Sequence, residues 1–177
     1  MNPTIRPEIS SDAPSIHTLT AEAFRDTPHS NHTEQFIVES LRNADALSVS
    51  LVADDQGSIV GHVAVSPIFI SDGSMGWYGL GPISVLPAAQ GQGVGSLLMQ
   101  EALSKLHELG AAGCVLLGDP AYYARFGFKP EPELVLPGVP EEYFQALSFG
   151  AGVPSGVVTY HAAFTRVTDK TFQQGSP

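Results

Sequence analysis

Apolar residues recur at steps of three and four in several stretches, a spacing that predicts helices. The clearest stretch is 94–109, with Gly110 after it at the position of a C-terminal cap. Shorter stretches predict one helix through 16–24, with candidate caps at 10–12, and another around 36–41. Asp119-Pro120 can begin a brief helix to Arg125, because proline is tolerated at the first helical position. About four helices are expected.

Alternating or continuous apolar runs between these helices predict strands. Seven runs qualify, at 4–6, 47–53, 59–70, 77–86, 114–117, 144–149 and 157–164. Polar turns at 54–57 and 71–74 join three of them into an antiparallel meander. The run 114–117 is uninterruptedly apolar, as in a strand buried on both faces, and we expect it to lie parallel to 77–86. Residues 128–140, rich in Pro and Glu, predict an irregular segment.

Composition favours one globular domain, expected at 1–168 with a frayed tail at 169–177. The 177 residues are 43% hydrophobic and 15% charged, enough to bury a core. Eight basic against eighteen acidic side chains give a net charge of −10, which argues against nucleic acid and anionic membrane as partners. The first seven residues lack the apolar segment of a signal peptide, and no run approaches the ~18 apolar residues of a membrane span. The cytoplasm is the expected compartment.

A strand, a glycine-rich turn and an amphipathic helix follow one another between Leu80 and Leu98. We call Gln90-Gly91-Gln92-Gly93-Val94-Gly95 the glycine turn. Its backbone N–H groups and the helix N-terminus can hold an anion such as a pyrophosphate. Ser96 stands where a Rossmann fingerprint needs its last glycine, and no lysine between Pro67 and Ser104 could serve a Walker loop.

The glycine turn resembles motif A of the GCN5-related N-acetyltransferases (GNAT), [QR]-x-x-G-x-[GA], with Gln90, Gly93 and Gly95 in place. The resemblance extends to Val85-Leu86-Pro87 before it, to a Y-x-x-x-G-F segment within 122–128, and to Val60-Gly61-His62-Val63 as a third strand. Residues 118–123 and 159–161 look most like the YhbS-type predicted bacterial acetyltransferases. The resemblance implies an α/β (α+β) fold: a mixed, mostly antiparallel sheet of about seven strands, splayed at a parallel pair and flanked by about four helices.

In this family the pantetheine of acyl-CoA lies between the splayed strands. Pro82 and Pro87 lack an N–H, which leaves a run of donors from Ile83 to Val85 between them, although Pro82 can equally mark a bulge. By resemblance one of these N–H groups polarises the thioester carbonyl, so Ser84 is a candidate catalytic residue together with Tyr123. The expected cofactor-binding residues are Ile83, Ser84, Val85, Gln90, Gly91, Gln92, Gly93, Val94, Gly95, Ser96, Asp119, Tyr123, Arg125 and Phe126.

Tyr123 occupies the position where the family often has the acid that protonates the departing thiolate. A free tyrosine pKa near 10 suits donation to a thiolate of pKa about 8.5. The alternative is that Tyr123 packs against the cofactor or the core, as expected for Tyr122. Arg125 could reach a phosphate or cap its short helix.

The general base is harder to assign. The family often has a glutamate on the strand before the turn, but residues 76–80 contain no carboxylate. His29, His32 and Glu34 could take a proton, although solvated loop residues are the favoured interpretation. We expect structural roles for His62 and His161, a solvent-facing His107 and a buried, unreactive Cys114, and no metal site, because no pair of histidines has metal-ligand spacing.

The predicted activity is direct transfer of an acyl group, most simply acetyl, from acetyl-CoA to an amine of a small molecule or peptide. One alternative is a non-catalytic acyl-CoA-binding sensor, favoured by the missing glutamate; another is a purely structural glycine turn. The acceptor pocket is expected between the loops 26–34 and 129–143. A homodimer is possible, as in many soluble enzymes.

Overall fold

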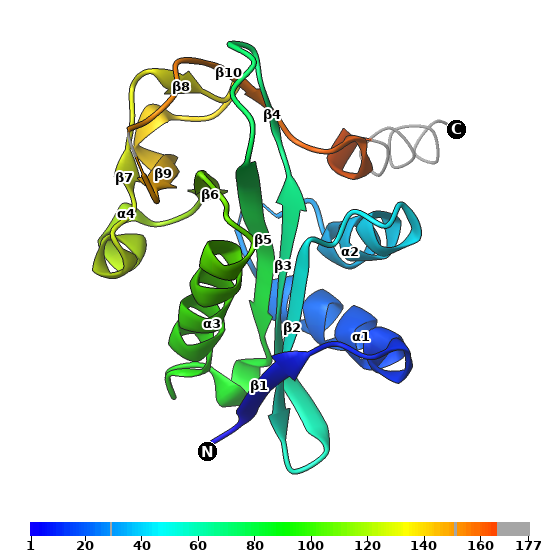
Figure 1. Cartoon of the computed structure of the whole chain (residues 1–177). Helices are drawn as coiled ribbons and strands as arrows, with labels where there is room; N and C mark the ends of the chain where they lie inside the picture. Colours follow the sequence, from blue (N-terminus) through cyan, green and yellow to red (C-terminus); the bar gives the residue numbers. More distant parts are fainter. Residues whose placement is uncertain (29, 151, 166–177) are drawn as a thin grey trace.

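The computed structural model describes residues 1–28, 30–150 and 152–165. Its main sheet has seven strands in the order β1-β2-β3-β5-β6-β9-β7 (Figure 1). These strands are Thr4–Pro7, Val49–Asp55, Ser58–Pro67, Trp77–Val85, Gly113–Leu117, Phe144–Ser148 and Lys129–Pro130. Within the described residues, β5 and β6 are the one parallel pair of this sheet. The predicted fold class is confirmed.

Helices cover both faces of this sheet. α1 (Ala13–Phe24), preceded by the 3-10 turn η1 (Ser10–Asp12), and α2 (Glu34–Asn43) pack on one face, and α3 (Val94–Glu108) packs on the other (Figure 1). Alternation along β2 explains the division: Val52 contacts the first helix pair, whereas its neighbour Leu51 belongs to the cluster around α3. α4 (Pro120–Tyr123) continues into η3 (Ala124–Phe126), and η2 (Pro87–Ala89) and η4 (Glu141–Tyr143) are single turns. The four predicted helices are all present.

A second, three-stranded sheet was not predicted. It has the order β4-β10-β8, with bounds Phe69–Ile70, Gly156–Thr159 and Leu134–Val135. The strand expected at 157–164 was placed wrongly: it ends at Thr159, joins this small sheet, and the chain is helical at 162–165. The seventh strand of the main sheet is instead β7, from the segment expected to be irregular. Ile70, Val158 and Leu134 bury one face of the small sheet against the main one.

The predicted tail at 169–177 lies outside the described residues, as does the boundary at 168. Across the part of the chain that the structure describes, none of the helices has the length and apolarity required to cross a bilayer.

The two central strands β5 and β6 separate partway along their length. They pair from Trp77 with Gly113 to Gly79 with Val115, and β5 then continues to Val85 without β6 beside it. On its other side β5 stays paired with β3, where a register shift places Ala64 opposite both Gly81 and Pro82. Pro82 does mark a bulge, and the expected splay at the parallel pair is present.

Candidate functional site

The edge of β5 that faces away from β3, from Leu80 to Val85, has no strand partner among the described residues; we call it the open edge. The Leu86 N–H donates to Val60 O at 2.9 Å, and the register around it is regular. Because antiparallel neighbours point their N–H and C=O groups alternately to either side, Ser84 faces β3, whereas Ile83 and Val85 face the open edge. Val85 O accepts a bond from Gln90 Nε2 at 3.0 Å, which is consistent with this assignment.

The glycine turn connects the open edge to the N-terminus of α3. Gly91 (φ 74°) and Gly93 (φ 84°) both have left-handed backbones, which glycine adopts without a steric penalty. The first bond of α3 runs from Leu97 N to Gly93 O at 3.1 Å, so the N–H groups of the residues between them have no partner within the helix. Three donors and the positive end of the helix dipole therefore meet at one place.

A groove of about 350 Å³ lies over this helix end. Its wall is the glycine turn, part of the open edge and the α4–η3 segment: Val85, Ala89, Gln90, Gly91, Gly93, Val94, Gly95, Ser96, Tyr122 and Arg125. The Arg125 guanidinium carbon lies 4.4 Å from the centre of the Tyr122 ring, and Arg125 Nε donates to Tyr122 O at 2.9 Å. The groove thus offers one cation and several N–H donors, a set suited to phosphates.

Comparison with known proteins decides the family. The model of the acetyltransferase (GNAT) domain matches residues 46–130. The Escherichia coli (strain K12) protein known as uncharacterized N-acetyltransferase YhbS is 38% identical over 170 residues, covering 92% of this chain and 98% of the relative. The chain belongs to the GNAT acetyltransferase family.

Two solved structures of family members are similar over nearly the whole chain. A GNAT family acetyltransferase from Brucella melitensis, in complex with acetyl-CoA, has a TM-score of 0.82 and 50% identity, covering 91% of this chain and 97% of that one. The structure of YhbS from Escherichia coli in complex with CoA also has a TM-score of 0.82, with 38% identity and coverage of 94% and 93%.

Eight of the fourteen predicted cofactor residues of this acetyltransferase line the groove: Val85, Gln90, Gly91, Gly93, Val94, Gly95, Ser96 and Arg125. Gln92 instead donates to Ala88 O at 3.0 Å, and Asp119 caps α4 by accepting from Ala121 N at 2.9 Å. Phe126 packs against the core around α3. The remaining three predicted cofactor residues, Ile83 and Ser84 on β5 and Tyr123 on α4, do not line the groove either.

Tyr122 was expected in the core, and that expectation was wrong. It is half-buried in the groove wall, with its hydroxyl 3.3 Å from Ser96 Oγ. The Y-x-x-x-G-F pattern begins at Tyr123 and gives Tyr122 no role. Its position in the groove wall could have been predicted from helical spacing. Tyr122 and Arg125 are three positions apart and therefore share a face of the α4–η3 segment.

Ser84 does not take the role predicted for it. Its side chain is 2% exposed on the α1 face of the sheet, where its hydroxyl donates to Thr20 Oγ1 at 3.5 Å. With its N–H toward β3 and its hydroxyl toward α1, Ser84 offers no donor to the open edge. The run of donors expected from Ile83 to Val85 reduces to the two alternate residues Ile83 and Val85.

Tyr123 is half-buried, does not line the groove and packs against the core around α3. Its ring makes an edge contact with the Tyr122 ring, with centroids 4.9 Å apart. Burial, with smaller contributions from Tyr122 and Asp119, raises the pKa of Tyr123 to about 12. The phenol therefore stays protonated at neutral pH and is a weaker acid than a free tyrosine.

The candidate bases lie in the segment before α2. His29 lies outside the described residues, and His32 is exposed in a left-handed backbone conformation (φ 59°). Glu34 is half-buried; one carboxylate oxygen accepts from Ser30 Oγ at 2.6 Å, and the other is buried without a partner among the described residues. Geometry assigns the base to none of them.

The other histidines and the cysteine match their expected roles. His62 is fully buried with Nε2 2.8 Å from Ser50 Oγ, and His161 Nδ1 accepts from Ala163 N at 3.0 Å. His107 is exposed beside the Phe149 ring. Cys114 is fully buried, and burial raises the pKa of its thiol. The described residues contain no group of His, Cys, Asp or Glu side chains that could hold a metal ion.

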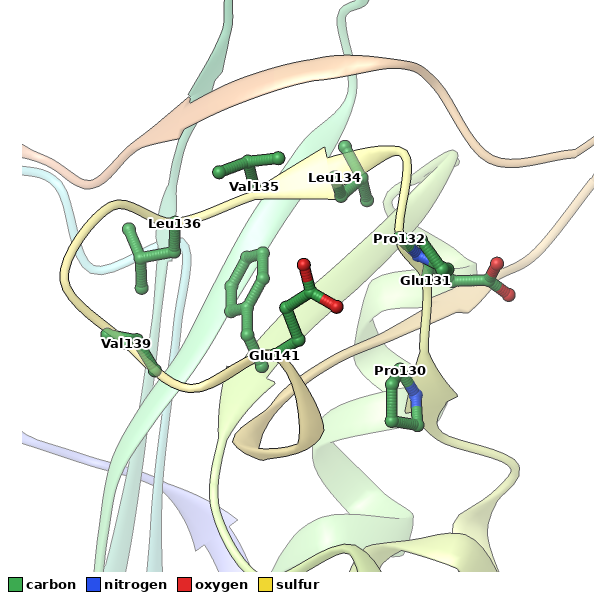
Figure 2. Close-up of a pocket in the computed structure, with 9 residues that line it drawn as sticks. Pro130, Glu131, Pro132, Leu134, Val135, Leu136, Val139 and Glu141 are labelled. Carbon is green, nitrogen blue, oxygen red and sulfur yellow. The ribbon is translucent and has the colours of Figure 1, made fainter.

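The segment 129–143, expected to shape an acceptor pocket, encloses a separate small cavity of about 40 Å³ between β7, β8 and η4 (Figure 2). Its walls are mostly prolines and aliphatic side chains, and Figure 2 shows the Glu141 carboxylate among them while that of Glu131 points away. A cavity of this size holds a few water molecules. The cavity therefore has room only for a group of a few heavy atoms.

Proposed function

We propose that the protein is an acetyl-CoA-dependent N-acetyltransferase that acetylates an amine of a small molecule or peptide. The observation that carries the proposal is the continuity between the open edge of β5 and the donor-rich N-terminus of α3. An extended pantetheine can pair with the first while its pyrophosphate occupies the second. The relatives from Brucella melitensis and Escherichia coli, seen with acetyl-CoA and CoA, support this donor.

Binding of the donor is divided between two parts of the site. The N–H groups of Val94, Gly95 and Ser96 face the pyrophosphate, and Arg125 supplies the positive charge of the groove. Val85 and Ile83 hold the pantetheine arm along the open edge. A chain with a net charge of −10 binds an anionic donor in this way because the favourable charges are local.

The acyl transfer follows from the same geometry. As the neutral amine attacks the thioester carbon, an N–C bond forms, and the Ile83 N–H, facing the open edge, stabilises the negative charge on the carbonyl oxygen. The nitrogen loses its proton to water. The carbonyl then re-forms while the C–S bond breaks. The Tyr123 hydroxyl donates a hydrogen bond to the departing sulfur, and the thiolate takes its proton from solvent. The products are the N-acetylated amine and the CoA thiol, without a covalent enzyme intermediate.

The contribution of Tyr123 is limited by its acidity. With its pKa at about 12 and a thiol pKa near 8.5, full proton transfer is unfavourable, so the hydroxyl acts mainly as a hydrogen-bond donor. We expect the enzyme to work in the cytoplasm, where the thiol of Cys114 remains reduced, and we expect a homodimer or a monomer.

Titration calorimetry with acetyl-CoA and a thiol-release assay with a panel of amines, amino acids and short peptides test the proposal together. Binding with amine-dependent thiol release is the expected result. Binding without release from any amine would indicate a sensor and contradict catalysis. Absence of binding at millimolar acetyl-CoA would contradict both functions.

A further inference from the structure

Gln145 on β9 is a buried polar residue close to the segment that carries Tyr123. Its side chain is 1% exposed, and Nε2 donates to Gly118 O at 3.0 Å. Gly118 N donates in turn to Tyr143 O at 3.0 Å. Both backbone groups of Gly118 are therefore fixed, one by Tyr143 at the end of η4 and the other by Gln145 on β9.

Gly118 lies against the Tyr123 ring. A Cβ atom built on Gly118 would overlap the Tyr123 ring, coming closer to it than real Cβ atoms come to their neighbours. The absence of a side chain at position 118 is thus what allows Tyr123 its present position. Asp119 completes the support, because its carbonyl accepts from Tyr123 N at 3.1 Å.

The second polar atom of Gln145 has no structural use. Because Nε2 donates to a carbonyl, the other atom must be the amide oxygen, and this Oε1 is buried without a partner among the described residues. A buried acceptor without a donor costs stability, and an apolar side chain of the same length would remove that acceptor while leaving Gly118 O without its donor. An unpaired buried acceptor beside a reacting group indicates a role in activity.

We propose that Gln145 is a positioning residue for Tyr123, acting through Gly118. Its Nε2 holds the Gly118 carbonyl, and Gly118 is the surface against which the Tyr123 ring rests. This inference rests on the proposed acetyltransferase function, in which the Tyr123 hydroxyl donates to the departing sulfur. Gln145 does not touch the reacting atoms.

The test is a double-mutant cycle on the full chain, with thiol release from acetyl-CoA and the best amine of the panel as the readout. Gln145→Met keeps the side-chain length and removes both polar atoms. We expect it to lower kcat about tenfold, with the KM for acetyl-CoA within about twofold. Tm should stay within a few degrees of the wild type, because the change removes the unpaired Gln145 Oε1 and leaves Gly118 O unpaired instead. In the Tyr123→Phe background the same change should alter kcat by less than about twofold, because the hydroxyl it positions is already gone.

Gly118→Ala tests the same contact from the other side. Its added methyl group displaces the Tyr123 ring, so the loss in kcat should match that of Gln145→Met and should also vanish in the Tyr123→Phe background. Gly150→Ala is the matched control, since a Cβ there meets no atom within 4 Å. Ser66→Ala removes a buried hydroxyl that likewise lacks a partner among the described residues. As a second control it should leave kcat unchanged, whatever its effect on Tm.

Two results would overturn the inference alone. The first is a loss in kcat from Gln145→Met that is as large in the Tyr123→Phe background as in the wild type. The second is a lowered Tm with unchanged kcat, as a structural role predicts. A wild-type protein that binds acetyl-CoA but releases no thiol with any amine would overturn the proposed function and this inference together.

Discussion

The two edges of β5 show how one strand can serve both the fold and the site. Toward β3, the strand is paired along nearly its whole length, and Ser84 and its partner His62 are both almost fully buried. Toward β6, pairing ends at Gly79, and the N–H groups of Ile83 and Val85 face no strand within the part of the chain that the structure describes. Successive residues of β5 therefore serve different purposes: Ser84 bonds within the sheet, whereas Ile83 and Val85 can bind a ligand.

This difference indicates where a ligand can bind in a sheet protein. Buried backbone N–H groups are almost always paired, so a stretch of strand interior without a neighbour calls for a partner from elsewhere. The open edge and the first turn of α3 are two such stretches, and they meet at the groove. The opposite edge of β5, which pairs with β3 and which we call the closed edge, contributes only to stability.

Proline substitutions at neighbouring positions contrast the two edges most strongly. Ile83→Pro removes an N–H of the open edge and leaves the ladder to β3 intact. Loss of one oxyanion donor corresponds to roughly a hundred- to thousandfold decrease in kcat. We expect that decrease in steady-state kinetics, with a loss in Tm of only a few degrees.

Ser84→Pro is the matched control, because it removes a ladder bond on the closed edge. It should lower Tm far more than Ile83→Pro, as measured by thermal unfolding. Equal effects of the two prolines on Tm and on kcat would show that β5 does not have two functionally distinct edges.

A carboxylate placed in the groove tests the α3 end of the open edge. Gly95→Glu puts a negative charge in the first turn of α3, where the helix dipole favours it, but opposite the expected pyrophosphate. Its Cβ would come within 3.3 Å of the Tyr122 hydroxyl, at the end of that side chain, a contact that a small shift relieves. We expect the Kd for acetyl-CoA to rise about a hundredfold by calorimetry with Tm preserved.

The control is Gln100→Glu, which adds the same charge at an exposed position farther along α3. It should leave the Kd within about twofold. An equal loss of affinity in both variants would mean that overall charge, not the groove, governs binding.

Tyr123→Phe has a smaller expected effect, because the thiolate is already a good leaving group. We predict that kcat falls about tenfold while the KM for acetyl-CoA stays within about twofold. Since the pKa of Tyr123 is about 12, its ionisation cannot cause a decline in kcat below about pH 10 in the wild type. An alkaline limb below that pH that disappears in the Phe variant would contradict the assignment.

The sequence predicted those parts of the site that depend on local chemistry. The glycine turn and the amphipathic helix 94–109 are local patterns, and the structure has a turn and a helix there. Pro82 is likewise a local signal, and it lies at the observed bulge. The parallel partner of β5 was found because a continuous apolar run is typical of a strand buried on both faces.

Features that depend on tertiary pairing were missed. The two-residue strands β7 and β8 are too short to produce an alternating pattern, and they exist because β9 and β10 lie beside them. Ser84 was assigned wrongly because the sequence does not show to which side of the strand each N–H group points. The pairing of Ser84 with His62 shows that its N–H points toward β3. Gln145 carries no sequence signal, since its role depends on a contact with Gly118, which is distant in sequence.

The closed edge makes a prediction of its own, through the pKa of His62. Burial, with a smaller contribution from Arg42, lowers this pKa from 6.5 to about 3, so the folded protein keeps the imidazole neutral while the unfolded chain binds a proton below about pH 6.5. Stability should fall as the pH drops from 6.5 toward 3, by roughly 2 kcal/mol at pH 5 from this group. His62→Gln should remove that part of the pH dependence in denaturant unfolding at pH 7.5 and 5, and the exposed His107→Gln should not. Unchanged pH dependence in His62→Gln would mean that the imidazole takes up a proton in the folded protein as readily as in the unfolded chain, and that burial at the closed edge does not keep it neutral.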